Sequence, residues 1–273
     1  MSRVREDDLA RISQALDSAR EVLRTLPGFQ VSSKGAAGPV TDADHAIDGA
    51  LRALLPQPGE GWLSEETADD HGRLACRRVW VVDPLDGTLE FVAGIPEWVV
   101  SVGLVEDGRA VAGGICNPAR GETFLGAVGL GLTLNGQPVR VREQARLAGA
   151  LVLASRSEVK RGEWTGSAGA FELQPMGSVA YKMARVAAGL ADATWTLSPK
   201  HEWDVAAGTA LVLAGGGRVA LPGGEAPCYN RPETLLPGLV ATSAALASEV
   251  EGFLRPRTGA GSPSAALDLP RRG

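Results

Sequence analysis

A short apolar run that leads straight into acidic and turn-forming residues is the feature that most constrains this chain. The run is RVWVV at residues 78–82, and DPLDGT follows at residues 83–88. Apolar runs of this length bounded by turn formers are typical of buried strands. Asp83 and Asp86 would then point from a strand end into one cleft, and Gly87 would open a helix whose free N–H groups favour phosphate. An Asp-capped turn is the structural alternative, since Asp, Pro and Gly all form turns.

Further carboxylates lie at the ends of other predicted elements. Glu65 and Glu66 follow two apolar residues, and Asp204 lies where a helix is expected to begin. Asp42 and Asp44 open another predicted helix in the same way. Taken singly, such acids are common on a solvated surface or in the first turn of a helix, where the helix dipole favours them. Only their combination indicates a shared site.

The overall charge excludes some classes of protein and favours a bound cation. The chain has 273 residues, a formal net charge of −5 and a pI near 5.4. This balance argues against a partner that is a nucleic acid polymer. An acidic chain that handles a phosphorylated substrate needs positive charge at its site, and a metal ion supplies it. No apolar stretch is long enough to predict a membrane span, and the first residues lack a signal-peptide core, so we expect a cytoplasmic protein without membrane contact.

Hydrophobic periodicity predicts a mixture of helices and strands. The expected helices cover residues 5–26, 42–55, 178–189 and 203–214, and the expected strands cover residues 78–82, 98–106, 109–117, 122–128, 151–154, 171–175 and 192–196. Hairpin signals dominate up to about residue 145, and strands alternate with helices after it. We therefore expect an N-terminal α+β half at 1–145, a C-terminal α/β half at 146–255, and a disordered tail at 256–273 that is rich in Pro, Gly, Ser and Arg.

Several motifs occur together in one order along the chain. They are VTDAD at 40–44, a Glu-Glu pair at 65–66, DPLDGT at 83–88, Gly177-Ser178 and WDVAAG at 203–208. In this order the motifs resemble those of the inositol monophosphatase superfamily, which also contains 3′(2′),5′-bisphosphate nucleotidases and some fructose-bisphosphatases. The resemblance covers about residues 8–250. It implies a metal-dependent phosphomonoesterase with a layered αβαβα sandwich fold.

The resemblance also implies a set of metal ligands. One Mg²⁺ is expected on Glu65, Asp83 and the backbone carbonyl of Leu85, and a second on Asp83, Asp86 and Asp204. A third and weaker ion is expected beside Glu65. Ligands that are all oxygen atoms suit a hard cation such as Mg²⁺.

The family mechanism that the resemblance implies uses an activated water. The hydroxyl of Thr88, linked to Asp44, is expected to orient that water and take its proton, with Glu65 as the third catalytic residue. Backbone N–H groups of Gly87 and Thr88 are expected to hold phosphate oxygens. Homodimer assembly and inhibition by lithium are also implied.

The substrate is less constrained than the reaction. Enzymes of this superfamily that act on inositol monophosphate usually carry a glutamate seven residues before Asp204, and this chain has Leu197 there. A leucine cannot accept hydrogen bonds from a polyol. The segment at residues 198–204 resembles the nucleotidases instead, and Arg156 could neutralise a second phosphate. Against this, the segment at 117–122 resembles the inositol phosphatases.

These features favour 3′-phosphoadenosine 5′-phosphate as substrate, with inositol 1-phosphate as the alternative, then fructose 1,6-bisphosphate or histidinol phosphate. The residues expected on the substrate side are Lys34, Arg156, Ala180 and Glu202, and a surface role is the alternative for Lys34 and Arg156. A catalytically silent binding protein on the same fold is disfavoured, because the carboxylates expected to hold the metal are all present.

Overall fold

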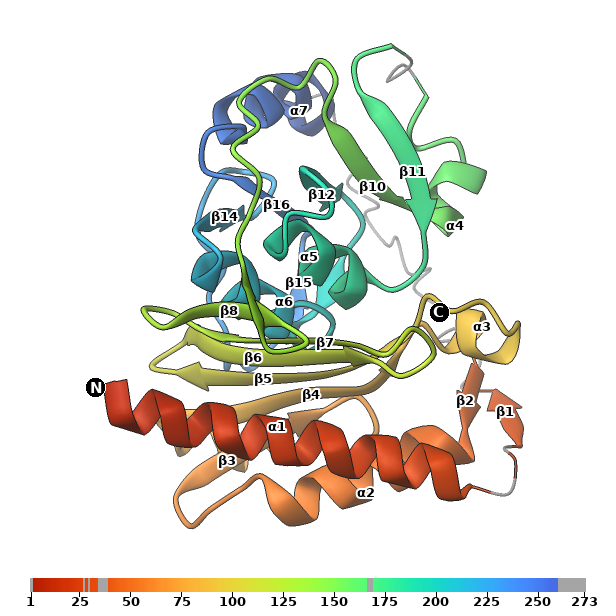
Figure 1. The fold of residues 1–273 in the computed structure, drawn as a ribbon, viewed down its shortest axis with the longest axis vertical. Helices are drawn as coiled ribbons and strands as arrows, with labels where there is room; N and C mark the ends of the chain where they lie inside the picture. Colours follow the sequence, from red (N-terminus) through yellow and green to blue (C-terminus); the bar gives the residue numbers. More distant parts are fainter. Residues whose placement is uncertain (1, 27, 29, 34–38, 166–168, 260–273) are drawn as a thin grey trace, which may run out of the picture.

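The protein, described here by a computed structural model, is built from alternating layers of helix and sheet (Figure 1). The structure describes residues 2–26, 28, 30–33, 39–165 and 169–259. The helices are α1 (Ser2–Thr25), α2 (Asp42–Leu54), α3 (Thr88–Val92), α4 (Arg156–Lys160), α5 (Val179–Ala187), α6 (Glu202–Ala214) and α7 (Ala247–Gly259). Helices α1 and α2 form one outer layer, α5 and α6 lie between two sheets, and α7 covers the far side. The expected αβαβα sandwich is confirmed.

The larger sheet has seven strands in the order β3-β4-β5-β6-β7-β8-β9. They are β3 (Glu60–Ser64), β4 (Arg78–Asp86), β5 (Val99–Glu106), β6 (Arg109–Asn117), β7 (Glu122–Ala127), β8 (Gly131–Leu134) and β9 (Gln137–Val139). In β4, Val79 and Val81 join the core under α5 and α6, whereas Trp80 and Val82 join the core under α1 and α2. All four side chains are fully buried. The unbroken apolar run is therefore explained by helices on both faces of the sheet.

Helix α6 approaches this sheet closely because two glycines lie beneath it. A Cβ atom on Gly103 would lie 2.9 Å from the backbone nitrogen of Ala207, and one on Gly113 would lie 2.6 Å from its carbonyl oxygen. Any larger residue would push the helix away from β5 and β6. The two glycines thus fix the height of α6 over the sheet.

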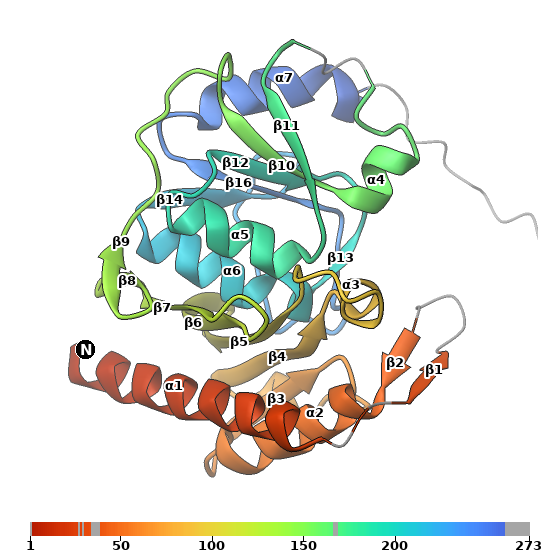
Figure 2. The ribbon, with the colours of Figure 1, turned by 45° about the vertical axis from the view of Figure 1, so that its right-hand side comes forward.

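The smaller sheet has five strands in the order β11-β10-β12-β16-β14. They are β10 (Leu151–Ser155), β11 (Glu172–Met176), β12 (Ala193–Thr196), β14 (Gly217–Ala220) and β16 (Leu239–Ser243). Short strand pairs complete the structure, namely β1 (Val31–Ser33) with β2 (Pro39–Thr41) and β13 (Lys200–His201) with β15 (Leu235–Leu236). An aromatic cluster around Trp195 and Phe171 packs with α7 on the outer face of the sheet. Figure 2 shows α5 and α6 enclosed between the two sheets.

Three expectations about element boundaries change. Strand β4 continues through Asp86 instead of ending at Val82, so both aspartates of its motif lie in an irregular part of the strand. Helix α7 runs to Gly259, so the first four residues of the predicted tail are helical. Residues 260–273 lie outside the described residues. Helix α6 begins at Glu202, one residue before the expected start at residue 203.

The two predicted halves share one hydrophobic core. The large sheet lies entirely before residue 140 and the smaller one entirely after residue 150. Residues of α5 and α6, such as Tyr181 and Ala206, nevertheless pack in one cluster with Val79 and Phe124 of the large sheet. The division near residue 145 therefore stays a prediction about sequence organisation.

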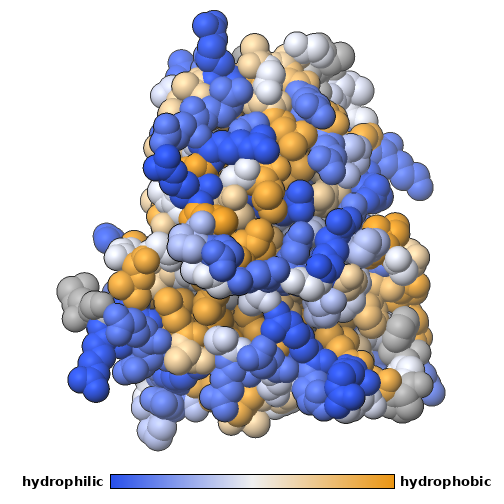
Figure 3. Space-filling view, viewed as in Figure 1, coloured by the Kyte–Doolittle hydropathy of each residue, from blue (hydrophilic) through white to orange (hydrophobic). Residues whose placement is uncertain are grey.

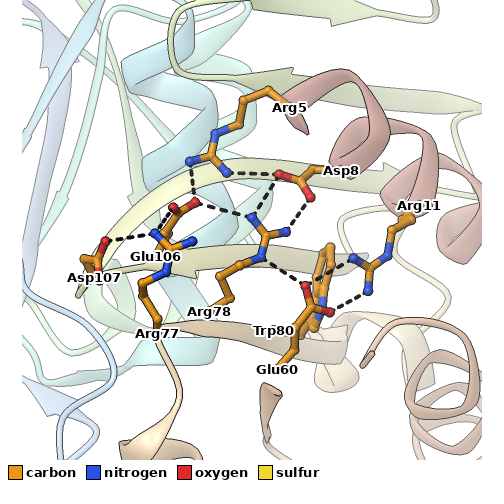
Figure 4. A network of polar contacts seen from close by, with 9 residues as sticks. All are labelled: Arg5, Asp8, Arg11, Glu60, Arg77, Arg78, Trp80, Glu106 and Asp107. Carbon is orange, nitrogen blue, oxygen red and sulfur yellow. Dashed lines mark hydrogen bonds and ion pairs between the residues drawn. The ribbon is translucent and has the colours of Figure 1, made fainter. Parts of the chain in front are cut away.

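A network of charged side chains fastens α1 to β3 and β4 (Figure 4). The Glu60 carboxylate accepts hydrogen bonds from Arg11 at 2.6 Å, Trp80 at 2.9 Å and Arg78 at 3.0 Å. Arg78 continues the network to Asp8 on α1. Burial alone would raise the pKa of Glu60, but hydrogen bonds from Arg11 and Trp80 outweigh this and lower it to about 2.

We expect Glu60→Gln to destabilise the protein by about 1–3 kcal/mol at pH 7, because the guanidinium groups lose their charged partner. A carboxyl group with a lowered pKa stabilises the fold above its ordinary value of 4.5 and loses that contribution as the pH falls towards 2. The difference in free energy of unfolding should therefore shrink at pH 3. Urea unfolding at both pH values measures it, with the exposed Glu21→Gln as the control. Equal stability of Glu60→Gln and wild type at pH 7 would contradict the prediction.

Candidate active site

The irregular end of β4 gathers the first part of the site. The register of β4 against β5 shifts between Asp83 and Asp86. Asp83 is only 1% exposed, and its Oδ1 accepts a hydrogen bond from the backbone N–H of Leu85 at 3.0 Å. Gly87 then turns the chain into α3 with φ of +98°, and a Cβ there would lie 2.9 Å from the carbonyl oxygen of Glu97. The sharp turn requires glycine at this position.

Asp86 connects this strand to the second half of the chain. Its Oδ2 accepts hydrogen bonds from Ser178 Oγ and from the backbone N–H of Ala180, both at 2.6 Å. Ser178 caps α5, since its Oγ also accepts from the backbone N–H of Tyr181 at 3.0 Å. It adopts φ of +56°, which is unusual for a residue with a side chain. The Gly177-Ser178 motif thus presents donors to a carboxylate 92 residues away.

Two further acids are fixed by the starts of helices. Asp204 is the third residue of α6, and its Oδ2 accepts from the backbone N–H of His201 at 2.9 Å. Asp44 closes a capping box with Thr41 on α2, accepting from its backbone N–H at 2.8 Å and its Oγ1 at 2.6 Å. The other Asp44 oxygen lies 3.5 Å from Thr88 Oγ1. Both acids therefore cap their helices, as the structural alternative predicts. Each cap uses one carboxylate oxygen, and the other oxygen takes no part in the cap.

The carboxylates of the site raise one another's proton affinity. Burial raises the pKa of Asp83 well above its ordinary value, and negative charge on Glu65, Asp86 and Asp204 raises it further. Burial and the charge of Asp86 likewise raise the pKa of Asp204 to about 8. For Asp86, burial raises the pKa, while the hydrogen bond from Ser178 partly offsets it. Repulsion among buried carboxylates costs folding free energy, which a bound cation would relieve.

The chemistry of these donors fits Mg²⁺. All of them are oxygen atoms, the ligands that a hard cation prefers. Across the described ranges, no group of three His, Cys, Asp or Glu side chains already has the arrangement of a metal cage. Instead, Asp83, Asp86 and Asp204 each accept hydrogen bonds from neighbouring N–H or O–H groups. Mg²⁺ usually binds through few carboxylates and keeps several waters, so such a site requires no closed cage.

A cavity of about 460 Å³ opens beside Asp86, Gly87 and Asp204. Its cationic lining residues are Arg156 and Lys160 from α4, Lys182 from α5 and Lys200 from β13. Its lining also includes the apolar side chains of Leu89, Ala93, Ile95 and Val179. The cavity therefore offers positive charge and apolar surface next to the carboxylates.

Lys182 is the residue of this cavity that sequence reasoning missed. It is 4% exposed, and its Nζ donates to the carbonyl oxygens of Ser178 at 3.0 Å and Met176 at 3.5 Å. Burial lowers its pKa to about 8, although the charges of Asp86 and Glu158 oppose the shift. The available signal was a lysine between Tyr181 and Met183 on the buried face of α5. Buried lysines are rare and costly, which makes this one a candidate site residue.

The expected substrate-side residues fall in different places. Arg156 lines the cavity and forms an ion pair with Glu97. Ala180 is buried, and its backbone N–H donates to Asp86. Lys34 lies outside the described residues.

Glu202 does not face the cavity. It is fully buried, and its two carboxylate oxygens accept from the backbone N–H groups of Asn230 at 2.8 Å and Arg231 at 3.0 Å. The side chain therefore holds the loop at 230–231, and we withdraw it as a substrate-binding residue.

A model of the inositol monophosphatase family matches residues 3–254. The chain belongs to this family. It is 33% identical over 228 residues to the inositol-1-monophosphatase of Mesorhizobium japonicum, covering 78% of this chain and 85% of that protein. The inositol monophosphatase of Anabaena (Nostoc) sp. PCC 7120 superposes with a TM-score of 0.74 at 25% identity, covering 93% and 96% of the two chains. CysQ from Bacteroides thetaiotaomicron superposes with a TM-score of 0.73 at 27% identity, covering 87% and 97%.

This member of the inositol monophosphatase family is therefore a phosphomonoester hydrolase. The family acts on small phosphorylated substrates and generally depends on Mg²⁺. None of the helices in the described part of the chain is sufficiently long and apolar to cross a membrane.

We expect Asp83→Asn to raise the melting temperature of this inositol monophosphatase family member in EDTA, because it replaces a buried carboxyl group whose charged form is disfavoured by an amide that carries no charge. Millimolar Mg²⁺ should raise the melting temperature of the wild type and not that of the variant. Differential scanning fluorimetry with and without Mg²⁺ measures both effects. Asp192→Asn is the control, since Asp192 is also buried but accepts from Leu151 instead. A full Mg²⁺ response in Asp83→Asn would refute this account.

Proposed function

We propose that the chain hydrolyses a small phosphomonoester with Mg²⁺ held by Glu65, Asp83, Asp86, Asp204 and the backbone carbonyl of Leu85. The supporting observation is that the pKa of Asp83 is raised well above its ordinary value. Burial contributes most to this shift, and the negative charges of Glu65, Asp86 and Asp204 add to it. When bound, Mg²⁺ supplies Lewis-acid activation of water and neutralises charge on the phosphate. Two ions, with a third and weaker one beside Glu65, form part of the proposal.

The protein's own groups would position and deprotonate the attacking water. Thr41 holds one oxygen of Asp44, which leaves the other oxygen facing the Thr88 hydroxyl at 3.5 Å. Thr88 can accept the proton of a water molecule while passing its own proton to Asp44. Glu65, which follows directly on β3, would help to orient the same water. The new P–O bond forms as the ester P–O bond breaks, and the released alkoxide takes up a proton.

The phosphate group would lie against the turn between β4 and α3. Gly87 lines the cavity between Asp86 and α3, where it brings backbone rather than side chain close to the substrate. We propose that the N–H groups of Gly87 and Thr88 hold phosphate oxygens there. Backbone donors of this kind are already in place before reaction, so they stabilise developing charge without reorganisation.

We propose 3′-phosphoadenosine 5′-phosphate as the preferred substrate. The cavity has four cationic side chains beyond the carboxylates, on α4, α5 and β13, which suit a second phosphate. Leu197 supports the same choice, because it stands where enzymes for inositol monophosphate usually carry a glutamate and cannot accept hydrogen bonds from a polyol.

Inositol 1-phosphate is the second candidate substrate. It is favoured by the relative from Mesorhizobium japonicum, which is named an inositol-1-monophosphatase. Homodimer assembly and lithium inhibition remain parts of the proposal that follow from family resemblance, and a cytoplasmic location is proposed from the sequence.

Phosphate release from a panel of substrates tests this function. The panel contains 3′-phosphoadenosine 5′-phosphate, inositol 1-phosphate, fructose 1,6-bisphosphate and histidinol phosphate, each with Mg²⁺ and with EDTA. We expect Mg²⁺-dependent release with the highest kcat/KM for the nucleotide, and a loss of about 100-fold or more in Asp204→Asn. A higher kcat/KM for inositol 1-phosphate would replace the preferred substrate with the second candidate. Release that is equal in wild type and Asp204→Asn would refute the site.

Lys182→Met is expected to weaken the use of a bisphosphate selectively. Loss of a charge-assisted hydrogen bond should lower kcat/KM for 3′-phosphoadenosine 5′-phosphate by about 10–100-fold, with a much smaller change for inositol 1-phosphate. Stability is expected to fall by about 1–3 kcal/mol, because the buried carbonyl oxygens of Ser178 and Met176 lose their donor, so urea unfolding is measured beside the kinetics. Arg161→Met is the control, because Arg161 pairs with Glu163 and does not line the cavity. Equal losses for both substrates would mean that Lys182 acts on the site as a whole.

A further inference from the structure

Helix α3 carries an exposed leucine at the edge of the cavity. Leu89 follows directly after Gly87-Thr88 and is 65% exposed, the highest value among the large hydrophobic side chains described as exposed. It lines the cavity together with Ala93, Ile95 and Val179. We call these four side chains the apolar shelf. Hydrophobic side chains reach the surface around α3 at the right of Figure 3.

The shelf rests on a firmly packed base. Phe91, on the other side of α3, meets Trp98 edge-to-face with ring centroids 4.9 Å apart, and both pack with Leu85 and Ala43. The backbone N–H of Ile95 donates to the carbonyl oxygen of Glu90 at 2.8 Å, which closes the end of the helix. The helix is thus held by Phe91 and not by Leu89. The exposed leucine is not needed to anchor α3, and its position beside the phosphate turn calls for another explanation.

Charge and apolar surface occur together in this one cavity. Arg156, Lys160, Lys182 and Lys200 line it from other elements, whereas the apolar shelf comes from α3, the turn after it and the start of α5. Figure 2 shows α3 and α4 on the same side of the molecule, near the start of α5. The lining also includes Glu90 and Glu158, and a leaving group that presents a ring face to the shelf and an anion to the cations suits the remainder. A polyol would lose hydrogen bonds against the shelf without replacing them.

We infer that the apolar shelf, with Leu89 at its centre, binds the heteroaromatic base of a nucleotide substrate and makes this hydrolase prefer nucleotides to polyol phosphates. Base faces are flat and weakly hydrated, so they gain by contact with exposed aliphatic side chains. This inference rests on the proposed function, because it assigns the leaving group of the same reaction.

Steady-state kinetics of Leu89→Ser and Leu89→Phe with two substrates test the shelf. The substrates are 3′-phosphoadenosine 5′-phosphate and glycerol 2-phosphate, which has no ring. In Leu89→Ser we expect KM for the nucleotide to rise about 3–10-fold at similar kcat. The KM for glycerol 2-phosphate should stay the same, so the ratio of the two KM values should rise by the same factor. In Leu89→Phe the ratio should return to the wild-type value or fall below it. Val92→Ser is the matched control, since Val92 is 41% exposed on the same helix and does not line the cavity.

Two results would overturn the inference. The first is a proportional loss for both substrates in Leu89→Ser, which would mean that Leu89 only supports α3. The second is an unchanged KM ratio in both Leu89 variants while the wild type hydrolyses both substrates with Mg²⁺, which would leave the proposed function standing without the shelf. Absence of Mg²⁺-dependent release from every substrate in wild type would instead refute the proposed function itself.

Discussion

Two hydrogen bonds from the start of α5 to Asp86 bring the halves of the site together. They join a strand of the large sheet to the cap of a helix that follows the first strands of the smaller sheet. Ser178 donates to Asp86 and accepts from Tyr181 while its backbone takes an unusual φ of +56°. The energetic cost of that conformation is offset by satisfying a carboxylate in a buried place. The shared core already packs α5 against the large sheet, and this contact fixes the Asp86 carboxylate at the start of that helix.

The second constraint is the close approach of α6 to the large sheet. Gly103 and Gly113 leave room for the backbone of α6, and this places Asp204 near the end of β4. Asp204 is also the acid that closes the cap of its own helix. One carboxylate thereby serves the local structure and the electrostatics of the site. The same is true of Asp44, whose capping box holds one oxygen and leaves the other near Thr88.

Much of the fold and the clustering of acids could be predicted, because both depend on local sequence signals. Apolar runs and helix caps show where strands end and helices begin, and the order of the motifs indicated the family. Contacts that depend on tertiary packing could not be predicted in this way. Glu202 is adjacent to a motif yet turns towards the loop at 230–231, since two backbone N–H groups there need an acceptor. In the sequence, Lys182 is a single polar residue within a predicted helix. Only the packing of α5 between the two sheets buries its side chain.

The cavity combines charges that would be unfavourable if each were buried alone. Asp86, Glu90 and Glu158 lie within electrostatic reach of Lys182, and their charges counteract the effect of burial on its pKa. Lys200 in turn lowers the pKa of Asp204, which burial and Asp86 raise. Each sign of charge thus limits the desolvation cost of the other. An incoming phosphomonoester brings negative charge to this balance, and bound Mg²⁺ would bring positive charge with it. Such a site can therefore accept both together more readily than either one singly, which ties substrate binding to metal binding.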